Sequence, residues 1–306
     1  SMGFTSIWIT PPVVQKSVQG NSAAYHGYWG VDFTTVDPHL GSEADFKELV
    51  AQAHKLNMKV IIDVVVNHTA DVIYYDSNGR PQVSASEANI KKPEWLNLIS
   101  NYHNLGNNPS IGNSVQDGDF YGLDDLETEN PKVISGWIDV WSNWITKFDI
   151  DGMRIDTFKH VNPEFWKAFI PKIQAAASAA GKKDFPIFGE AADTDAASLS
   201  TYVAGGEVPS VLDFDFQKQV KGFVQFGVAA ESLAELFNRD DLYTTPTTNA
   251  YGLATFLGNH DMGRIGYFLT NAVAVGENQT LLERAKLANA SLFLLRGGPV
   301  LYYGDE

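Results

Sequence analysis

The sequence predicts an α/β fold in which a parallel sheet closes into an eight-stranded TIM (β/α)8 barrel. Two observations predict this class. Short apolar strands alternate along the chain with amphipathic helices, and successive strands end in polar clusters. These clusters are Asn67-His68, Arg154 with Asp156, Glu190, and Asn259-His260-Asp261. The carboxyl ends of barrel strands surround one mouth, whereas an open doubly wound sheet would spread such clusters, so the barrel is favoured.

The first predicted helix and strand lie between residues 42 and 66. Ser42 and Asp45 form a capping box that begins a helix reaching about residue 56. Residues 60–66 are β-branched except at Asp63, which is typical of a strand buried on both faces of a parallel sheet. A charge inside such a strand is costly unless it is paired. We therefore predict that Asp63 is a buried structural acid with a hydrogen-bonded partner.

The alternation continues to the end of the chain. Asn130-Pro131 and Asn162-Pro163 each predict the start of a helix, and a strand over about residues 150–155 lies between these helices. The later predictions, in order, are a short strand ending at residue 188, a helix near 193–203, a strand near 211–214, a helical stretch to about 238, a strand over 251–257, a helix over 280–295 and a strand over 299–303.

One connection is much longer than the others. About 60 residues rich in Asn, Gly, Ser and Asp separate His68 from the helix at Asn130, far more than an ordinary βα loop contains. We interpret residues 69–122 as a small inserted, irregular domain over the barrel mouth. On this interpretation residues 1–68 form the first part of the barrel and residues 123–306 the second part.

The composition excludes several classes of function. The chain has 37 Asp+Glu and 22 Lys+Arg, a net charge of −15, and no cluster of basic residues, so nucleic acid and anionic membranes are not expected as partners. The absence of cysteine removes disulfides, Cys-zinc sites and a thiol nucleophile. The seven histidines show no His-x-x-x-His or His-x-His spacing, which disfavours a transition-metal hydrolase.

Three carboxylates at predicted strand ends indicate the chemistry. Glycoside hydrolysis needs a general acid and a nucleophile that flank one bond, and Asp156, Glu190 and Asp261 offer both types of group. Each residue alone could equally be a helix cap or a surface charge. Arg154 strengthens the case, because it lies two residues before Asp156 on the same strand face and can hold that carboxylate ionised.

Four segments of the chain resemble the signature blocks of the α-amylase family, glycoside hydrolase family 13. They are Asp-Val-Val-Val-Asn-His at 63–68, Gly-Met-Arg-Ile-Asp-Thr-Phe-Lys-His at 152–160, Phe-Gly-Glu at 188–190 and Phe-Leu-Gly-Asn-His-Asp at 256–261. The blocks occur in the family's order at compatible spacing. Two further segments, at 123–126 and 25–29, resemble the family's calcium-site motif and its early aromatic block. The resemblance covers nearly the whole chain.

The resemblance implies a role for each matching residue. Asp156 would be the nucleophile, Glu190 the acid/base, and Asp261 the third carboxylate, which grips sugar hydroxyls and stabilises the transition state. Tyr28 would stack beneath the sugar at the cleavage point, although a plain core aromatic is the alternative for this residue. The complete set of implied substrate contacts is Tyr28, His68, Arg154, Lys159, His160 and His260.

The resemblance also implies a bound calcium ion between the barrel and the inserted domain. Its ligands would include the side chains of Asn67 and Asp125 and the carbonyl of His160, which are hard oxygen donors of the kind Ca²⁺ prefers. A simple hydrogen-bonded bridge between the same groups is the alternative. The family's first strand and closing helix are expected to be missing, because residues 3–10 resemble the second strand and residues 302–306 the eighth.

The predicted function is that of a glycoside hydrolase of the α-amylase type, which cleaves internal α-1,4 bonds of starch or maltooligosaccharides with retention. A cyclodextrin-forming α-glucan transglycosylase is the first alternative, because both reactions share the covalent glycosyl-enzyme intermediate. A catalytically silent sugar-binding barrel is the second, although such relatives lose the carboxylates that this chain keeps. We expect an α-glucan as the partner, a monomer, and a secreted or periplasmic location.

Overall fold

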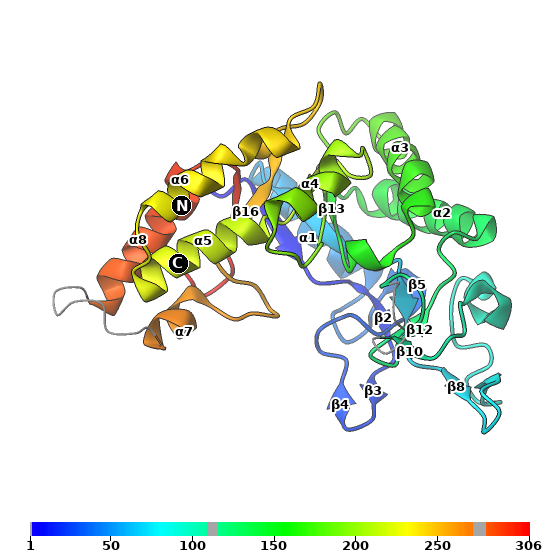
Figure 1. Ribbon diagram of the computed structural model, residues 1–306. Coiled ribbons are helices and arrows are strands. Elements are labelled where there is room, and N and C mark those ends of the chain that lie inside the picture. Colours follow the sequence, from blue (N-terminus) through cyan, green and yellow to red (C-terminus); the bar gives the residue numbers. More distant parts are fainter. Residues whose placement is uncertain (1, 109–114, 272–279) are drawn as a thin grey trace. The chain divides into compact units, whose positions relative to one another are not determined.

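The computed structural model describes residues 2–108, 115–271 and 280–306. Helices and strands alternate along the chain, as Figure 1 shows. The chain forms two compact units, residues 1–187 and 188–306. Within the described residues, no helix combines the length and the apolar character that a membrane crossing would require.

Parallel strands form the centre of the first unit. β1 (Ser6–Ile9), β6 (Lys59–Val64) and β13 (Gly152–Ile155) pair in the order β1-β6-β13. The β6 prediction is confirmed, with the strand ending two residues earlier than expected. The register of β6 and β13 sets Arg154 directly opposite Asp63. Pairing between strands that are distant in sequence therefore brings a cation beside the buried acid.

Three helices cover this sheet, and each begins where the sequence predicts. α1 (Glu43–Lys55) follows the capping box of Ser42 and Asp45. α2 (Pro131–Phe148) begins with Pro131, and α3 (Pro163–Ala179) begins with Pro163. α2 and α3 lie side by side (Figure 1). The α2 face toward the core carries three fully buried tryptophans, Trp137, Trp141 and Trp144.

The segment that follows β6 contains short strands and turns. Its strands are β7 (His68–Thr69), β8 (Ile73–Tyr75), β9 (Pro81–Val83), β10 (Asn107–Asn108), β11 (Asp119–Phe120) and β12 (Asp124–Asp125). The antiparallel pair of β7 and β12 sets Asp125 opposite His68. The buried ammonium of Lys91 lies 2.5 Å from Asp124, whose carboxylate also accepts the N–H groups of Val72 and Ile73. This ion pair stabilises the segment.

Four further strands precede α1. They are β2 (Val13–Gln15), β3 (Val18–Gln19), β4 (Ser22–Ala23) and β5 (Gly30–Val36).

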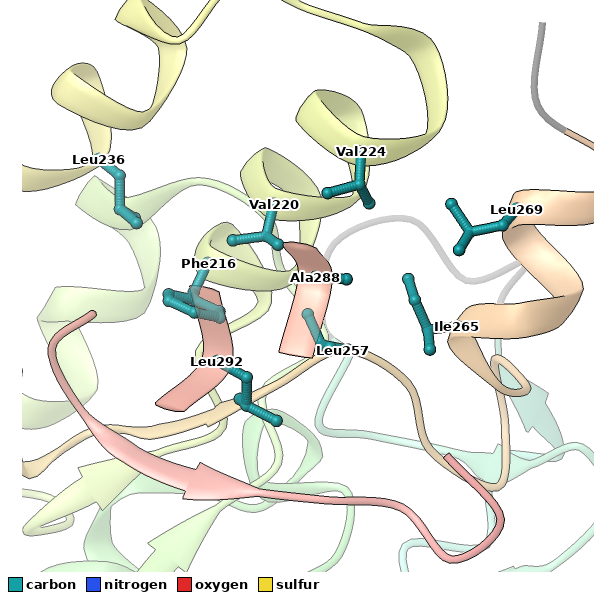
Figure 2. Packing of buried hydrophobic residues seen from close by; sticks show 9 residues of the cluster. All are labelled: Phe216, Val220, Val224, Leu236, Leu257, Ile265, Leu269, Ala288 and Leu292. Carbon is teal, nitrogen blue, oxygen red and sulfur yellow. The ribbon is translucent and has the colours of Figure 1, made fainter. Parts of the chain in front are cut away.

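The strands of the second unit also run parallel. β14 (Ile187–Gly189), which spans the division between the units, pairs with β15 (Ser210–Val211), and β16 (Ala254–Phe256) pairs with β17 (Gly298–Val300). A parallel bridge between Leu212 and Ala254 joins the two pairs. The helices of this unit are α4 (Ala196–Ala204), α5 (Phe214–Phe226), α6 (Glu231–Asn238), α7 (Ile265–Thr270) and α8 (Leu281–Leu294). Figure 2 shows side chains of α5, α6, α7 and α8 packed with Leu257 into one apolar core.

Four predicted elements of the second unit differ from the structure. The strand predicted over 251–257 is confined to β16, because Ala250–Gly252 forms a short 3₁₀ helix. The strand predicted over 211–214 ends at Val211, because Asp213 caps α5 by accepting the N–H of Phe216 at 2.9 Å. The helical stretch predicted to 238 is divided into α5 and α6, because Gly227 is left-handed (φ 65°) and ends α5. The strand predicted over 299–303 ends at Val300. The parallel α/β class is confirmed, while closure into a barrel, the missing first strand and the inserted domain stay predictions.

Candidate active site

A buried arginine organises the carboxylates of the first unit. Nη1 of Arg154 donates to both oxygens of Asp63, at 2.8 and 2.9 Å, and to Oδ1 of Asp156 at 2.8 Å. Arg154 and Asp63 are fully buried, and Asp156 is 6% exposed. A buried charge is tolerated only when it is paired and hydrogen-bonded. The partner predicted for Asp63 is therefore present, and so is the contact predicted between Arg154 and Asp156.

The backbone at Thr157, directly after Asp156, adopts a conformation that residues other than glycine rarely adopt. Thr157 has φ 46° and ψ 37°, in the left-handed region, which is a genuine outlier for a β-branched residue. Such strain is found where the surrounding structure fixes a functional segment. Asp156 itself directly follows β13, so it lies at a strand end as predicted.

Tyr28 belongs to the same hydrogen-bond network. Its hydroxyl donates to Oδ2 of Asp63 at 2.8 Å, and its ring stacks on His26 with the centroids 5.8 Å apart. Burial first, and then the charge of Asp63, raises the pKa of Tyr28 well above its usual value. The phenol therefore stays neutral and serves as a hydrogen-bond donor that holds Asp63 in place.

A short series of rings contains two of the predicted sugar contacts. The buried ring of His68 stacks on Phe120 (centroids 5.8 Å apart), and Phe120 meets His160 edge-on at 4.7 Å. Burial, followed by the nearby His160, lowers the pKa of His68 to about 3, so this imidazole is neutral at ordinary pH. Its Nε2 is buried and makes no hydrogen bond within the described part of the chain.

Tyr121 is a functional candidate that the sequence analysis missed. It follows Phe120 in a tight turn closed by Phe120 and Leu123, which exchange backbone hydrogen bonds of 3.1 and 3.0 Å. Both central residues have positive φ, 53° at Tyr121 and 87° at Gly122, which is the pattern of a type I′ turn. Asn or Gly would be unstrained at the first position. Instead the turn presents an aromatic ring that is 85% exposed.

The other two predicted catalytic carboxylates belong to the second unit. Glu190 directly follows β14 and is partly exposed. Asp261 lies in a loop after β16, and its carboxylate is 60% exposed, with Oδ2 3.4 Å from Nε2 of His260. Glu190 and Asp261 therefore both follow the carboxyl end of a parallel strand, where the sequence places them. Lys159 and His160 form a short 3₁₀ turn after Asp156 in the first unit.

One of the predicted calcium ligands, Asn67, has a side-chain oxygen without a hydrogen-bond partner among the described residues. Oδ1 of Asn67 is buried and accepts no hydrogen bond from the residues that the structure describes. Asn67 directly precedes His68, which pairs with Asp125 across β7 and β12. Amide and carboxylate oxygens are both donors of the kind that Ca²⁺ prefers. The described residues contain no group of three or more His, Asp or Glu side chains placed for a metal, whereas the predicted set uses one carboxylate, one amide and one carbonyl.

His103 is a second residue that the sequence analysis missed. Its Nδ1 lies 2.5 Å from Oδ2 of Asp125, and its Nε2 lies 3.0 Å from Glu129. Burial alone would lower the pKa of His103, but its interactions with Asp125 and Glu129 outweigh burial and raise this pKa to about 9. The resulting cation partly balances the buried carboxylate of Asp125. No sequence pattern signalled this contact, because it joins a long loop to β12.

Comparisons with known proteins identify the family that this chain resembles. The family model "Alpha amylase, catalytic domain" matches residues 1–306. The alpha-amylase of Streptomyces lividans is 41% identical, over all of this chain and 38% of that protein. The cyclomaltodextrin glucanotransferase of Klebsiella oxytoca is 29% identical, over all of this chain and 50% of that protein.

A solved structure is similarly close. The alpha-amylase of Geobacillus thermoleovorans, complexed with acarbose, superposes with a TM-score of 0.80 and 32% identity, over all of this chain and 61% of that one. The chain thus spans less than two thirds of the length of each of these relatives. The match to the family model over the whole chain, together with the shared fold, shows that this chain belongs to the α-amylase family, glycoside hydrolase family 13.

Proposed function

We propose that this protein hydrolyses internal α-1,4 bonds of α-glucans such as starch and maltooligosaccharides, with retention of configuration. The observation that carries the proposal is the buried Arg154, whose Nη1 contacts Asp63 and Asp156 together. A guanidinium at this distance favours the ionised form of a carboxylate and fixes its orientation. A nucleophilic Asp156 needs both properties.

The proposed reaction has two steps. In the first, a carboxylate oxygen of Asp156 bonds to the anomeric carbon while the glycosidic bond breaks, and the carboxylic acid of Glu190 gives its proton to the leaving oxygen. In the second, Glu190 takes a proton from water, and the water oxygen displaces Asp156 from the anomeric carbon. Asp261 stabilises the positive charge of the transition state through the sugar hydroxyls. Two inversions give a product with the α configuration.

Several side chains support the proposed binding of sugar at the cleavage point. His68 is a neutral imidazole whose buried Nε2 is free to bond a hydroxyl. Tyr28 is fixed by its hydrogen bond to Asp63, so its ring is a rigid surface on which a sugar ring can stack. We assign Lys159, His160 and His260 to further sugar contacts. Tyr121 adds an exposed aromatic ring for a sugar outside the cleavage point.

Calcium binding is part of the proposal. Asn67 and Asp125 would hold the ion with their side chains and His160 with its carbonyl, and the unmet Oδ1 of Asn67 supports this assignment. When bound, the ion would supply positive charge that these oxygens share. Asp125 already forms an ion pair with His103. We further propose that the protein acts as a monomer in a secreted or periplasmic location, where polymeric glucans are found.

Transglycosylation is the second candidate. The likeness to a cyclomaltodextrin glucanotransferase supports it, and so does the exposed ring of Tyr121, which offers a surface for an acceptor sugar. Both reactions pass through the same intermediate on Asp156. They differ only in whether water or a sugar hydroxyl attacks that intermediate.

Product analysis tests the proposal and separates the two candidates. The protein is incubated with soluble starch and with maltoheptaose, and proton NMR follows the anomeric form while chromatography follows product size. Short α-anomeric maltooligosaccharides are expected. Cyclic or lengthened products would favour the transglycosylase, and initial release of the β anomer would contradict a retaining mechanism. Glucan binding without any turnover would indicate a silent sugar-binding barrel.

A further inference from the structure

The loop that carries Asp261 is closed at its base. Oδ1 of Asn259 accepts the N–H groups of Asp261 and Met262, at 3.1 and 2.9 Å, and the Asn259 carbonyl accepts the N–H of Gly263 at 2.8 Å. A Cβ on Gly258 would lie 2.1 Å from the carbonyl oxygen of Gly263. The two ends of the loop therefore touch, and a displacement at its end is transmitted to Asp261.

Arg264 fixes the outer end of this loop to a segment about 40 residues further along the chain. Its Nε donates to the carbonyl of Tyr303 at 2.8 Å. Its guanidinium lies 4.4 Å from the ring centroid of Tyr303 and 5.0 Å from that of Tyr302. A guanidinium combines a directional hydrogen bond with stacking on aromatic faces, which an ammonium does not reproduce.

The segment that receives Arg264 is itself held in place. Both carboxylate oxygens of Asp305 lie within reach of the N–H of Ile265, at 3.2 and 3.3 Å. Gly304 has φ +85°, and a Cβ there would lie 2.5 Å from Nε of Arg264. A side chain at position 304 would therefore displace the guanidinium. The loop end and the 302–305 segment form one interlocked structure.

The carboxylate of Asp261 depends on this anchoring. Within the described residues, its side chain meets only His260, at 3.4 Å. Its position therefore follows from the backbone of the loop rather than from contacts of its own. Asp261 is also close to the interlocked segment, since its charge is among the influences that, after burial and Tyr303, raise the pKa of Tyr302.

We propose that Arg264 is a positioning residue for the reaction, which fixes the Asp261 loop against Tyr302 and Tyr303 and so places the carboxylate that contacts the sugar. The inference rests on the proposed function, in which Asp261 stabilises the transition state. A displacement of about 1 Å caused by a change remote from the chemistry can cost about 100-fold in rate. Because ground-state binding uses many other contacts, the loss falls on kcat rather than on KM.

The experiment compares four variants with maltoheptaose as substrate. Arg264→Met removes the hydrogen bond and the charge, and Arg264→Lys keeps the charge. Arg80→Met is the matched control, because Arg80 is an exposed arginine in the turn between β8 and β9. Asp261→Asn tests the proposed function independently. Each variant is measured for kcat, KM and thermal melting.

We expect Arg264→Met to lower kcat by about 100-fold, with KM and the melting temperature close to wild type, and Arg264→Lys to recover part of the loss. Arg80→Met should match wild type. An Arg264→Met enzyme with kcat within about twofold of wild type, beside an inactive Asp261→Asn, would overturn the positioning role alone. An active Asp261→Asn would overturn the role of Asp261 and the inference together. If Arg264→Met does not fold, a folded Arg264→Lys with unchanged kcat overturns the inference, and one with reduced kcat at unchanged KM supports it.

Discussion

Arg154 bonds to Asp63 with one nitrogen, which lies 2.8 and 2.9 Å from the two carboxylate oxygens. The same nitrogen donates to Asp156, the proposed nucleophile. Asp63, which has no part in the proposed chemistry, therefore holds the guanidinium that orients Asp156. Tyr28 completes the group by donating to Asp63. Fold stability and the proposed site therefore depend on one set of contacts.

Arg154→Met should damage both stability and activity. It leaves the carboxylates of Asp63 and Asp156 buried without their cation, and breaking such a pair costs about 3–5 kcal/mol. We expect a loss of this size in urea unfolding, together with loss of glucan hydrolysis. Arg80→Met, which removes an exposed arginine, should change the free energy of unfolding by less than about 0.5 kcal/mol. Equal effects of the two substitutions would contradict this account.

Glu190→Gln should abolish hydrolysis and leave glucan binding intact. The amide has nearly the same shape as the acid but has no proton to give to the leaving oxygen. Turnover of maltoheptaose is compared with its affinity measured by calorimetry. A variant that keeps more than about one part in a hundred of the wild-type turnover would show that Glu190 is not the general acid, because general acid catalysis contributes about 10²–10⁴-fold.

Tyr121→Asn should weaken the binding of long glucans and spare the fold. Asn tolerates the left-handed backbone of this turn better than Tyr does, so the melting temperature should stay or rise slightly. Loss of an aromatic contact worth about 1 kcal/mol raises KM about fivefold at unchanged kcat. Tyr251→Asn is the control, since Tyr251 is also exposed but precedes β16. An unchanged KM for soluble starch would remove Tyr121 from the binding surface.

Chelation should lower the melting temperature if Asn67 and Asp125 hold calcium. A ligand that binds only the folded state stabilises it by about 2.7 kcal/mol at 100 times its dissociation constant. We expect EDTA to lower the melting temperature of the wild type and added calcium to restore it, while Asn67→Ala responds much less. Asn143→Ala, at an exposed position of α2, should respond like wild type. A melting curve that EDTA leaves unmoved would refute the calcium proposal.

Lys182→Met should destabilise the protein at neutral pH but not in acid. Lys182 lies 2.8 Å from Asp151. Burial alone would raise the pKa of Asp151, but the hydrogen bonds from Lys182, the N–H of Val60 and His54 outweigh burial and lower this pKa. A carboxylate with a lowered folded-state pKa contributes stability above its unfolded value of about 3.9, and this contribution is lost as the pH falls through the folded value.

We expect Lys182→Met to lower the free energy of unfolding by about 1 kcal/mol at pH 7. The difference between Lys182→Met and wild type should shrink as the pH falls below about 4, where Asp151 takes up its proton. Guanidinium unfolding at several pH values measures it. Lys183→Met is the neighbouring control, at an exposed position. A difference that stays constant down to the acid limit would show that Lys182 acts through packing rather than charge.

The sequence alone predicts where the three helices of the first unit begin and which residues are candidates for chemistry. The capping box of Ser42 and Asp45 and the prolines at the starts of α2 and α3 are local signals, because a cap or a fixed φ acts within one helical turn. The need of Asp63 for a partner was also readable, since an unpaired charge cannot be buried in an apolar strand.

Which of these groups meet depends on the folded chain. Arg154 reaches Asp63 through the register of β6 and β13, and Arg264 reaches Tyr303 across about 40 residues of chain. Both contacts have the same physical origin. Pairing register, close approach and burial depend on segments far apart in sequence, whereas helix caps and periodicity depend only on residues that are neighbours in sequence.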